Sequence, residues 1–341
     1  MNDFQNQQIR LAARPIGKPT TQDFAVVNEG IGAPQQGEVL LEILYLSLDP
    51  YMRGRMSDAK SYAKPLDIGD VMEGGTVARV KQSQHPDFKP GDIVLSYSGW
   101  QRCALAKGES LRKIDPAVAP ISTALGVLGM PGFTAYAGLL TLGKPQPGET
   151  VVVAAASGAV GSVVGQIARI KGARAVGIAG GAEKCAFVKD ELGFDAVVDH
   201  RSPTFAEDLA KACPKGIDVY FENVGGKVWE GVFPLLNSFA RVPVCGLIAQ
   251  YNQLPGELEG PDRFPATMRD VLTKSLTIRG FIQTEFVAQF PEFYTQAAQW
   301  IKDGTLRYRE DMVDGLDAAP EAFIGLLEGK NFGKLVVKVS D

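Results

Sequence analysis

The stretch VVVAAASGAVGSVVGQIARIK, residues 151–171, decides the fold of this chain. Its apolar run 151–156 is typical of a strand buried on both faces of a parallel sheet. A helical pattern follows at once, with apolar side chains at 160, 163, 164 and 167 and Gly172 after the last turn. Strand, glycine turn and helix open a dinucleotide-binding unit, because the free N–H groups of the helix N-terminus can face a pyrophosphate.

The glycine pattern departs from the usual G-x-G-x-x-G. Ala155 or Ala156, depending on the register, stands at its first position, and Gly158-x-x-Gly161-x-x-x-Gly165 remains. This spacing also occurs where a helix only packs closely on a sheet, but the strand before it and the helix after it favour cofactor binding. The turn residues expected to contact the cofactor are Gly158, Ala159, Val160 and Gly161.

Length and composition are those of an ordinary globular enzyme. The 341 residues allow two domains and a large core, and 45% of them are hydrophobic. The net charge of −4 gives no reason to expect nucleic acid or an anionic membrane as a partner. No apolar run approaches a membrane span, and the polar start lacks a signal-peptide core, so a cytoplasmic protein is expected.

Potential metal ligands are scarce and scattered. The cysteines are Cys103, Cys185, Cys213 and Cys245, and the histidines are His85 and His200. No two cysteines have C-x-x-C spacing, which argues against a zinc ribbon and against a redox pair. The cysteines are therefore expected to be small apolar fillers.

Residues 1 to about 125 are predicted to be rich in β-strands, with runs at 38–48, 75–80 and 93–97 between Pro and Gly clusters. That rhythm suggests a compact, barrel-like β domain. The segment 122–136 is helix-like, with a break predicted at Met130-Pro131-Gly132.

From 151 to about 285, strands alternate with helices, which argues for a doubly wound parallel sheet. The predicted strands are 151–156, 175–179, 196–199, 218–222, 241–246 and 277–282, and the predicted helices include 183–192 and 205–212. Pro243 fits its strand badly, since proline cannot donate to the ladder, so a bulge or local unpairing is expected there. The Pro- and Gly-rich loop 249–265 is a candidate lid or binding loop.

The tail is predicted to contain a helix from Pro291, a short helix over 320–328 and a strand over 333–339. A terminal strand needs a sheet to join, and the first domain is the obvious host. We therefore expect a discontinuous β-rich domain, 1–128 and 300–341, with a Rossmann domain, 129–299, inserted in it.

The second strand of the unit indicates which dinucleotide is bound. In NAD-binding units an acidic residue about 20 positions after the glycine turn bonds the ribose 2′-hydroxyl. Here the strand ends at Ala179, Gly180 and Gly181, and Lys184 follows. The missing acid and the nearby cation favour a 2′-phosphate, hence NADP(H), although Lys184 could also be an ordinary solvated lysine.

Several motifs together carry a family resemblance. They are SLDPYMRGRM at 47–56, GMPGFTAY at 129–136, ASGAVGSVVGQ at 156–166, FENVGG at 221–226, CGLIAQYN at 245–252 and NFGK at 331–334. With these motifs the chain resembles the medium-chain dehydrogenase/reductase superfamily, and more narrowly its zinc-free leukotriene hydroxydehydrogenase/prostaglandin reductase branch. Within the branch it is most similar to bacterial NADPH-dependent curcumin reductases.

The resemblance implies a GroES-like domain formed by both chain ends, an inserted Rossmann domain, an active site in the cleft and a homodimer. Metal-bearing relatives have a cysteine in the region matching Leu46 to Asp49 and a His-Glu pair where this chain has Met72-Glu73. Since this chain has neither the cysteine nor the histidine, catalytic zinc is not expected.

The resemblance also implies site residues. It places the pyrophosphate on Gly158 to Gly161 and the 2′-phosphate on Lys184, and it places Asn223 near the cofactor ribose. At the position of His200 the branch often has a tyrosine that contacts the 2′-phosphate or the adenosine end. The imidazole of His200 could make a similar contact. The residues implied for the nicotinamide side are Cys245, Gly246, Leu247, Ile248, Ala249, Gln250, Tyr251, Phe281, Ile282, Gln283 and Asn331.

Reduction of an enone leaves negative charge on the carbonyl oxygen, so catalysis needs a hydrogen-bond donor there and a proton for the α-carbon. Without metal, the candidate donors are Tyr51, Tyr62 and Tyr251, because a phenol donates at neutral pH without first losing a proton. Each could instead be a pocket-lining aromatic. Arg53 and Arg55 could contact an acidic substrate or could pair with local carboxylates.

These observations predict an NADPH-dependent, zinc-independent reductase of conjugated C=C bonds in enones or enals. Two alternatives stay open at this point. The first is a quinone reductase on the same scaffold, and the second is a non-catalytic NADPH-binding protein.

Overall fold

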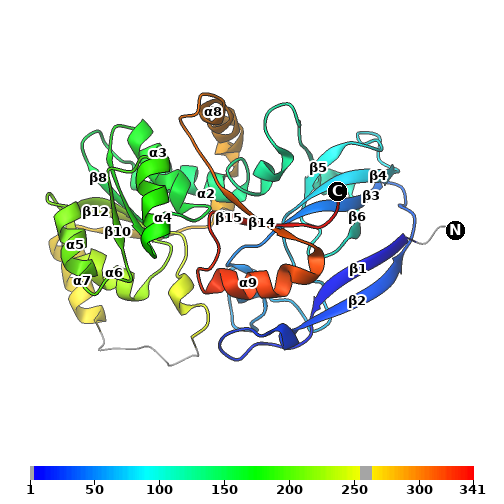
Figure 1. The fold of residues 1–341 in the computed structure, drawn as a ribbon, viewed down its shortest axis with the longest axis horizontal. Helices are drawn as coiled ribbons and strands as arrows, with labels where there is room; N and C mark the ends of the chain where they lie inside the picture. Colours follow the sequence, from blue (N-terminus) through cyan, green and yellow to red (C-terminus); the bar gives the residue numbers. More distant parts are fainter. Residues whose placement is uncertain (1–3, 254–262) are drawn as a thin grey trace. The chain divides into compact units, whose positions relative to one another are not determined.

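The computed structural model describes residues 4–253 and 263–341, and the chain divides into two compact units. The first unit joins the residues up to Gly126 to Glu310–Asp341, and the second unit is Val127–Arg309. The second unit is thus inserted into the first along the chain, and each is described below by itself (Figure 1).

The first unit is built mainly from strands. Its strands are β1 Phe4–Leu11, β2 Phe24–Ile31, β3 Glu38–Ser47, β4 Thr76–Ser83, β5 Ile93–Ser96, β6 Cys103–Lys107, β7 Arg112–Lys113, β14 Glu310–Asp314 and β15 Lys334–Lys338. Its helices are α1 Met52–Arg55 and α9 Ala319–Leu327, with 3-10 turns η1 Thr21–Asp23, η2 Gly108–Ser110, η3 Ile121–Leu125 and η9 Leu316–Ala318.

In the described part of the chain, the larger sheet of this unit has the order β14-β15-β3-β4-β5-β7, with β6 also paired to β3. The C-terminal strand β15 pairs antiparallel with β3, with Val336 opposite Ser47. This confirms that the tail strand joins the sheet of the first domain. The antiparallel pair β1 and β2 was not predicted, because neither the polar sequence of β1 nor the sequence FAVVNEGI of β2 alternates apolar and polar residues.

The second unit alternates strands and helices. Its strands are β8 Thr150–Ala154, β9 Arg174–Ala179, β10 Ala196–Asp199, β11 Ile217–Phe221, β12 Leu236–Val244 and β13 Thr277–Gly280. Its helices are α2 Met130–Ala137, α3 Gly161–Ile170, α4 Ala182–Ala186, α5 Phe205–Ala212, α6 Gly226–Val232, α7 Phe264–Thr273 and α8 Phe290–Lys302. Shorter turns are η4 Gly138–Gly143 and η5 Phe187–Glu191, both π-helical, and the 3-10 turns η6 Phe233–Leu235, η7 Ile248–Gln250 and η8 Gln283–Gln289.

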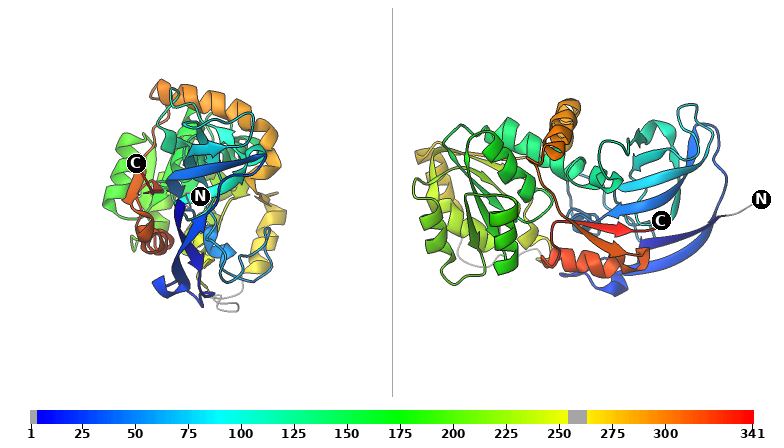
Figure 2. Two further views of the ribbon diagram at one scale, coloured as in Figure 1. Left: turned by 90° about the vertical axis from the view of Figure 1, so that its right-hand side faces the viewer. Right: turned by 45° about the horizontal axis from the view of Figure 1, so that its top comes forward.

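The parallel sheet of this unit has the strand order β10-β9-β8-β11-β12-β13 among the described residues. The chain starts in the middle, runs outward to one edge, and then returns to build the other half, as in a doubly wound Rossmann sheet. Helices cover both faces of this sheet (Figure 2). All strand carboxyl ends therefore meet at one edge, and the order reverses between β8 and β11.

Two local predictions need correction. A helix begins where the sequence predicted a helix break, at 130–132: α2 starts at Met130. Pro131 lies in its first turn, where the missing N–H costs no hydrogen bond. Pro243 keeps its register opposite Arg279 on β13. The irregularity of β12 lies earlier, between the pairs Ile217–Leu236 and Val219–Arg241.

Most of the predicted loop 249–265 lies outside the described residues. Within residues 4–253 and 263–341, none of the helices combines the length and the apolar character that a membrane span requires.

Candidate active site

The bend that follows β8 has the geometry of a phosphate cradle. Ala155 adopts a left-handed backbone with a φ of 52°, and the Gly158 N–H donates to its carbonyl oxygen at 2.9 Å. Helix α3 begins at Gly161 immediately afterwards, so its first N–H groups point out of the carboxyl edge of the sheet. Ala155 therefore makes the left-handed step of the bend, directly before Ala156, the residue at the first G-x-G-x-x-G position when Gly158 and Gly161 are its third and sixth.

The glycines of this stretch have different tasks. A Cβ on Gly161 would lie 2.3 Å from the carbonyl oxygen of Ala155, so the bend itself requires glycine there. A Cβ on Gly165 would lie 1.9 Å from the ring of Phe194, so that glycine serves close packing. Close approach explains both glycines, of the backbone at Gly161 and of the Phe194 ring at Gly165, and contact of the bend with a cofactor stays a prediction.

The end of β9 carries a cluster of cationic side chains. A Cβ placed on Gly180 would lie 2.6 Å from His200 Nε2 and 3.0 Å from Arg201 Nε, so the imidazole and the guanidinium approach the same point. The carboxylate of Asp199 accepts the backbone N–H groups of Gly181 and Arg201 at 3.1 and 2.9 Å. An adenosine 2′-phosphate would fit the charge of this cluster.

Electrostatics link Lys184 to the same cluster. Burial, then the charge of Arg201 and then that of Lys184 lower the pKa of His200, and only Asp199 opposes them by charge. The pKa of His200 in the free protein therefore lies below the ordinary value for histidine. The sequence prediction named Lys184 and His200 but not Arg201, although its position directly after the third strand was a readable signal.

Asn223 lies at the same edge, directly after β11. Its amide donates to the carbonyl oxygen of Ala154 at 2.8 Å, which brings it to the glycine bend. The loop is fixed by the buried Glu222, whose Oε1 accepts the Val224 and Gly225 N–H groups at 2.7 and 2.9 Å. These contacts explain why an acidic residue precedes Asn223 in the motif.

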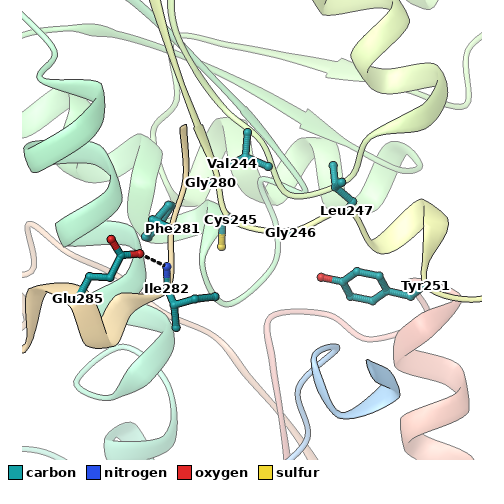
Figure 3. A pocket seen from close by; sticks show the side chains of 9 residues that line it. All are labelled: Val244, Cys245, Gly246, Leu247, Tyr251, Gly280, Phe281, Ile282 and Glu285. Atoms are coloured by element: carbon teal, nitrogen blue, oxygen red, sulfur yellow. Dashed lines mark hydrogen bonds between the residues drawn. The ribbon is translucent and has the colours of Figure 1, made fainter. Parts of the chain in front are cut away.

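A cavity of about 390 Å³ lies beyond the ends of β12 and β13. It is lined by Val244, Cys245, Gly246, Leu247, Tyr251, Gly280, Phe281, Ile282 and Glu285 (Figure 3). Six of these residues were predicted to line the nicotinamide side. The predicted residues Ile248, Ala249, Gln250 and Gln283 are not among them, because they lie in the turns η7 and η8.

The hydroxyl of Tyr251 points toward the middle of this cavity (Figure 3). Its hydroxyl would lie 3.0 Å from a Cβ on Gly246, so glycine leaves room for the phenol. Burial, and then the carboxyl of Glu222, raise the pKa of Cys245 to about 12, so this thiol stays neutral and lines the cavity as an apolar group. Glu285 accepts the Ile282 N–H at 2.8 Å and fixes the far wall.

The first unit gathers the other two candidate tyrosines. The guanidinium carbon of Arg55 lies 5.6 Å from the ring centre of Tyr51 and 4.7 Å from that of Tyr62. Arg55 is itself paired with Glu73, with 2.5 Å between Nε and Oε1. Burial, then Asp49 and then Glu73 raise the pKa of Tyr51 far above its usual value, so its phenol keeps its proton.

The two arginines named in the sequence analysis have partners within the chain. Arg55 pairs with a local carboxylate, and Arg53 donates to the carbonyl oxygen of Gly17 at 2.8 Å. Asn331, also in the first unit, donates to the Gly333 carbonyl at 2.8 Å.

The region matching the ligands of metal-bearing relatives is built differently here. Lys334 occupies it, with its ammonium 2.9 Å from Asp49 Oδ1 and 2.7 Å from the Leu48 carbonyl oxygen. In the described part of the chain, no three His, Cys, Asp or Glu side chains are grouped as metal ligands. The donor set around Asp49 is thus that of a buried ion pair and does not suit zinc.

Comparison with known families supports this architecture over both units. Residues 7–114 match the family described as "N-terminal domain of oxidoreductase", and residues 159–303 match "Zinc-binding dehydrogenase".

Individual relatives match over nearly the whole chain. The NADPH-dependent curcumin reductase of Escherichia coli (strain K12) is 54% identical, with 98% of this chain and 97% of the relative covered. Prostaglandin reductase 1 of Bos taurus is 40% identical, with 95% and 96% covered. The crystal structure of CurA from Vibrio vulnificus in complex with NADPH has a TM-score of 0.95 and 55% identity, with 98% of this chain and 99% of that chain covered.

Proposed function

The chain belongs to the medium-chain dehydrogenase/reductase family, in the branch of the prostaglandin reductases, and we propose that it reduces the conjugated C=C bond of enones and enals with NADPH. The observation that carries this proposal is the convergence of the glycine bend, the cationic cluster and the cavity at one edge of the second unit's sheet. Relatives named for NADPH-dependent reduction of curcumin and for prostaglandin reduction support it.

The residues present fit NADPH. The bend at Gly158–Gly161 would take the pyrophosphate, and Lys184, His200 and Arg201 would take the 2′-phosphate. The cavity around Cys245 and Phe281 would take the nicotinamide end. Bound there, NADPH supplies a hydride for the β-carbon of the substrate.

The chain's own part in the reaction is to hold charge on the carbonyl oxygen. A phenol is a neutral donor, and one aimed at that oxygen strengthens its hydrogen bond as the oxygen becomes an enolate. Tyr251 in the second unit and Tyr51 and Tyr62 in the first are the candidates. We infer that this donation needs no metal, because the donors around Asp49 form an ion pair with Lys334.

The experiment that tests the function follows NADPH consumption with three classes of acceptor. Curcumin and a short enone such as 3-penten-2-one should be reduced, whereas a quinone should be reduced more slowly. Faster turnover of the quinone would favour the quinone reductase. Thermal stabilisation by NADPH without turnover of any acceptor would favour the non-catalytic binding protein.

The role of Tyr251 has its own test. Removing its hydroxyl in Tyr251→Phe should lower kcat about 100- to 1,000-fold while NADPH affinity stays unchanged, the size seen when one donor to an oxyanion is lost. Turnover equal to that of the parent protein would leave Tyr251 as part of the cavity wall.

We also propose a homodimer, which the exposed edge of the second unit supports. Strand β13 ends the sheet, and its outer edge has no partner strand among the described residues. Beside it, α7 exposes Phe264, Met268 and Leu272, which follow each other at helical spacing. An unpaired edge strand together with exposed apolar side chains favours pairing with the same surface of a second copy across a two-fold axis.

A further inference from the structure

The ten residues after α1 form a loop whose base is closed by Arg55. The Leu66 N–H donates to the Arg55 carbonyl oxygen at 2.9 Å, so the chain returns to this residue after the excursion. Arg14 reinforces the closure, because its guanidinium donates to the carbonyl oxygens of Met56 and Leu66 at 3.2 and 2.8 Å. The base of the loop is thus held by backbone groups.

Tyr62 lies in the middle of this loop, where no backbone ladder fixes it. Its side chain is 61% exposed, so packing alone leaves its ring many orientations. The guanidinium carbon of Arg55 lies over this ring, 4.7 Å from its centre. Orientation of the Tyr62 phenol therefore depends on that guanidinium.

The same guanidinium also lies over Tyr51. Tyr51 directly precedes the single turn α1, and Arg55 is its last residue. This spacing of four residues brings their side chains together. Glu73, from a separate part of the chain, holds the guanidinium in place through the 2.5 Å contact with Nε. The side chain of Arg55 is 7% exposed, so its charge needs this partner.

We propose that Arg55 is a positioning residue: anchored by Glu73, its guanidinium holds the rings of Tyr51 and Tyr62 and so presents both phenols to the substrate carbonyl. This rests on the proposed function, since the phenols matter to catalysis only if an enone is reduced. It assigns Arg55 a task other than binding an acidic substrate, because the charge of Arg55 is already met by Glu73.

The test compares Arg55→Met, Arg55→Lys and Glu73→Gln with the parent protein. Methionine keeps the apolar stem and removes the cation, lysine keeps the cation without the planar fork, and glutamine releases the anchor. The control is Lys113→Met, since Lys113 is also paired with a carboxylate, Asp92 at 2.9 Å, and lies 5.4 Å from a ring centre, that of Phe88.

Two measurements separate positioning from folding. The first is kcat/KM for 3-penten-2-one beside the dissociation constant of NADPH. The second is fluorine NMR of 3-fluorotyrosine placed at position 62, which reports the orientation of the ring without any turnover.

Arg55→Met should lower kcat/KM about 3- to 30-fold, the size of a partly buried cation–π contact, with NADPH affinity unchanged and a narrowed, shifted fluorine line. Arg55→Lys should recover part of the loss, and Lys113→Met should match the parent. If Arg55→Met does not fold, Glu73→Gln decides, and its fluorine line should shift in the same direction.

An unchanged fluorine line and unchanged kcat/KM in the folded variants would overturn the proposal. An equal loss of NADPH affinity would also overturn it, because that points to general damage. Failure of the parent protein to reduce any enone would refute the proposed function instead, and the fluorine line would still decide whether Arg55 orients Tyr62.

Discussion

Ala155 has a backbone conformation that the sequence motif does not reveal. Its φ of 52° is the left-handed conformation that glycine adopts freely and that costs other residues about 1–2 kcal/mol. The bend therefore takes a left-handed step at an alanine, where glycine would carry no such cost. Arg201 is the opposite case, since it belongs to no motif and only the folded sheet brings it to Gly180.

The first prediction at this scale concerns cofactor choice. Lys184→Ala and Arg201→Ala should each raise KM for NADPH about 10- to 100-fold, because each removes a charge-assisted contact to a phosphate. KM for NADH should change less than twofold. Arg169→Ala serves as the control, since Arg169 is half exposed near Asp195 and away from this cluster. Equal changes for the two cofactors would contradict the 2′-phosphate role.

The second residue-scale prediction is a pH dependence carried by His200. Burial, Arg201 and Lys184 lower its pKa in the free protein and Asp199 raises it, whereas a bound 2′-phosphate dianion beside the imidazole favours the charged form. The bound-state pKa is then higher than the free one, so binding takes up a proton. The extra affinity is complete below the free pKa and is lost as pH rises through the bound pKa.

The measurement is the dissociation constant of NADPH between about pH 7 and 9, where the phosphate, whose second pKa is near 6, is fully ionised. Affinity should weaken by up to about tenfold per pH unit in the parent protein and stay flat in His200→Tyr. NADH should show no such slope in either protein. Parallel NADPH curves in the two proteins would exclude His200 from the linkage.

At the scale of elements, the carboxyl edge of the parallel sheet organises the candidate site. The bend after β8, the pair 180–181 after β9, the pair 200–201 after β10 and the loop after β11 all stand there, because parallel strands end on the same side. The bulge in β12 belongs to this scale too. Phe239 turns to a φ of 63° and donates its N–H to the Lys274 carbonyl at 2.7 Å, and this lets Pro243 keep its register.

The element-scale prediction is that Gly161→Ala opens the bend. Its methyl group would lie 2.3 Å from the Ala155 carbonyl oxygen, so the backbone must move. We expect a loss of about 1–3 kcal/mol in unfolding free energy and at least about a tenfold weaker binding of NADPH.

Calorimetry with NADPH and thermal unfolding would measure the two effects of Gly161→Ala. Gly32→Ala is the control, because a Cβ there meets nothing within 4 Å. Full NADPH affinity in Gly161→Ala would show that the cofactor does not depend on this bend.

On the scale of the whole molecule, two units come from one interrupted sequence. Strand β15 closes the first unit more than 280 residues after β3 begins, and the second unit folds between them around its own core. The proposed dimer and the cytoplasmic location are properties beyond one chain, and both stay predictions.

The whole-molecule prediction is that the dimer depends on the edge near β13. Leu272→Lys combined with Ile278→Lys places charges on a helix residue that is 79% exposed and on the edge strand. Light scattering should then give the 36.6 kDa of one chain, whereas the parent should give twice that mass. Ile16→Lys, at another exposed apolar residue, should stay dimeric. A dimeric double variant would place the interface elsewhere.

The sequence by itself determined the elements whose apolar pattern is strong and local: the first strand of the parallel sheet, which ends at Ala154 and not at the predicted residue 156, the helix after it, the helix Phe205–Ala212 and the doubly wound class of the sheet. These follow from neighbouring residues, since a buried strand and an amphipathic helix each have their own period. The family motifs likewise named Gly161 and Tyr251, and the end of the second strand indicated Lys184.

Only the tertiary structure decided which of several similar residues form the bend, the cationic cluster and the ion pair of Arg55. It separated Ala155 from Ala156, brought Arg201 to Lys184 and His200, and paired Arg55 with Glu73. It also left η7 out of the lining of the cavity and β13 at an open edge. Each of these depends on segments far apart in the chain, and contacts of that kind follow from packing and long-range electrostatics, which no local pattern encodes.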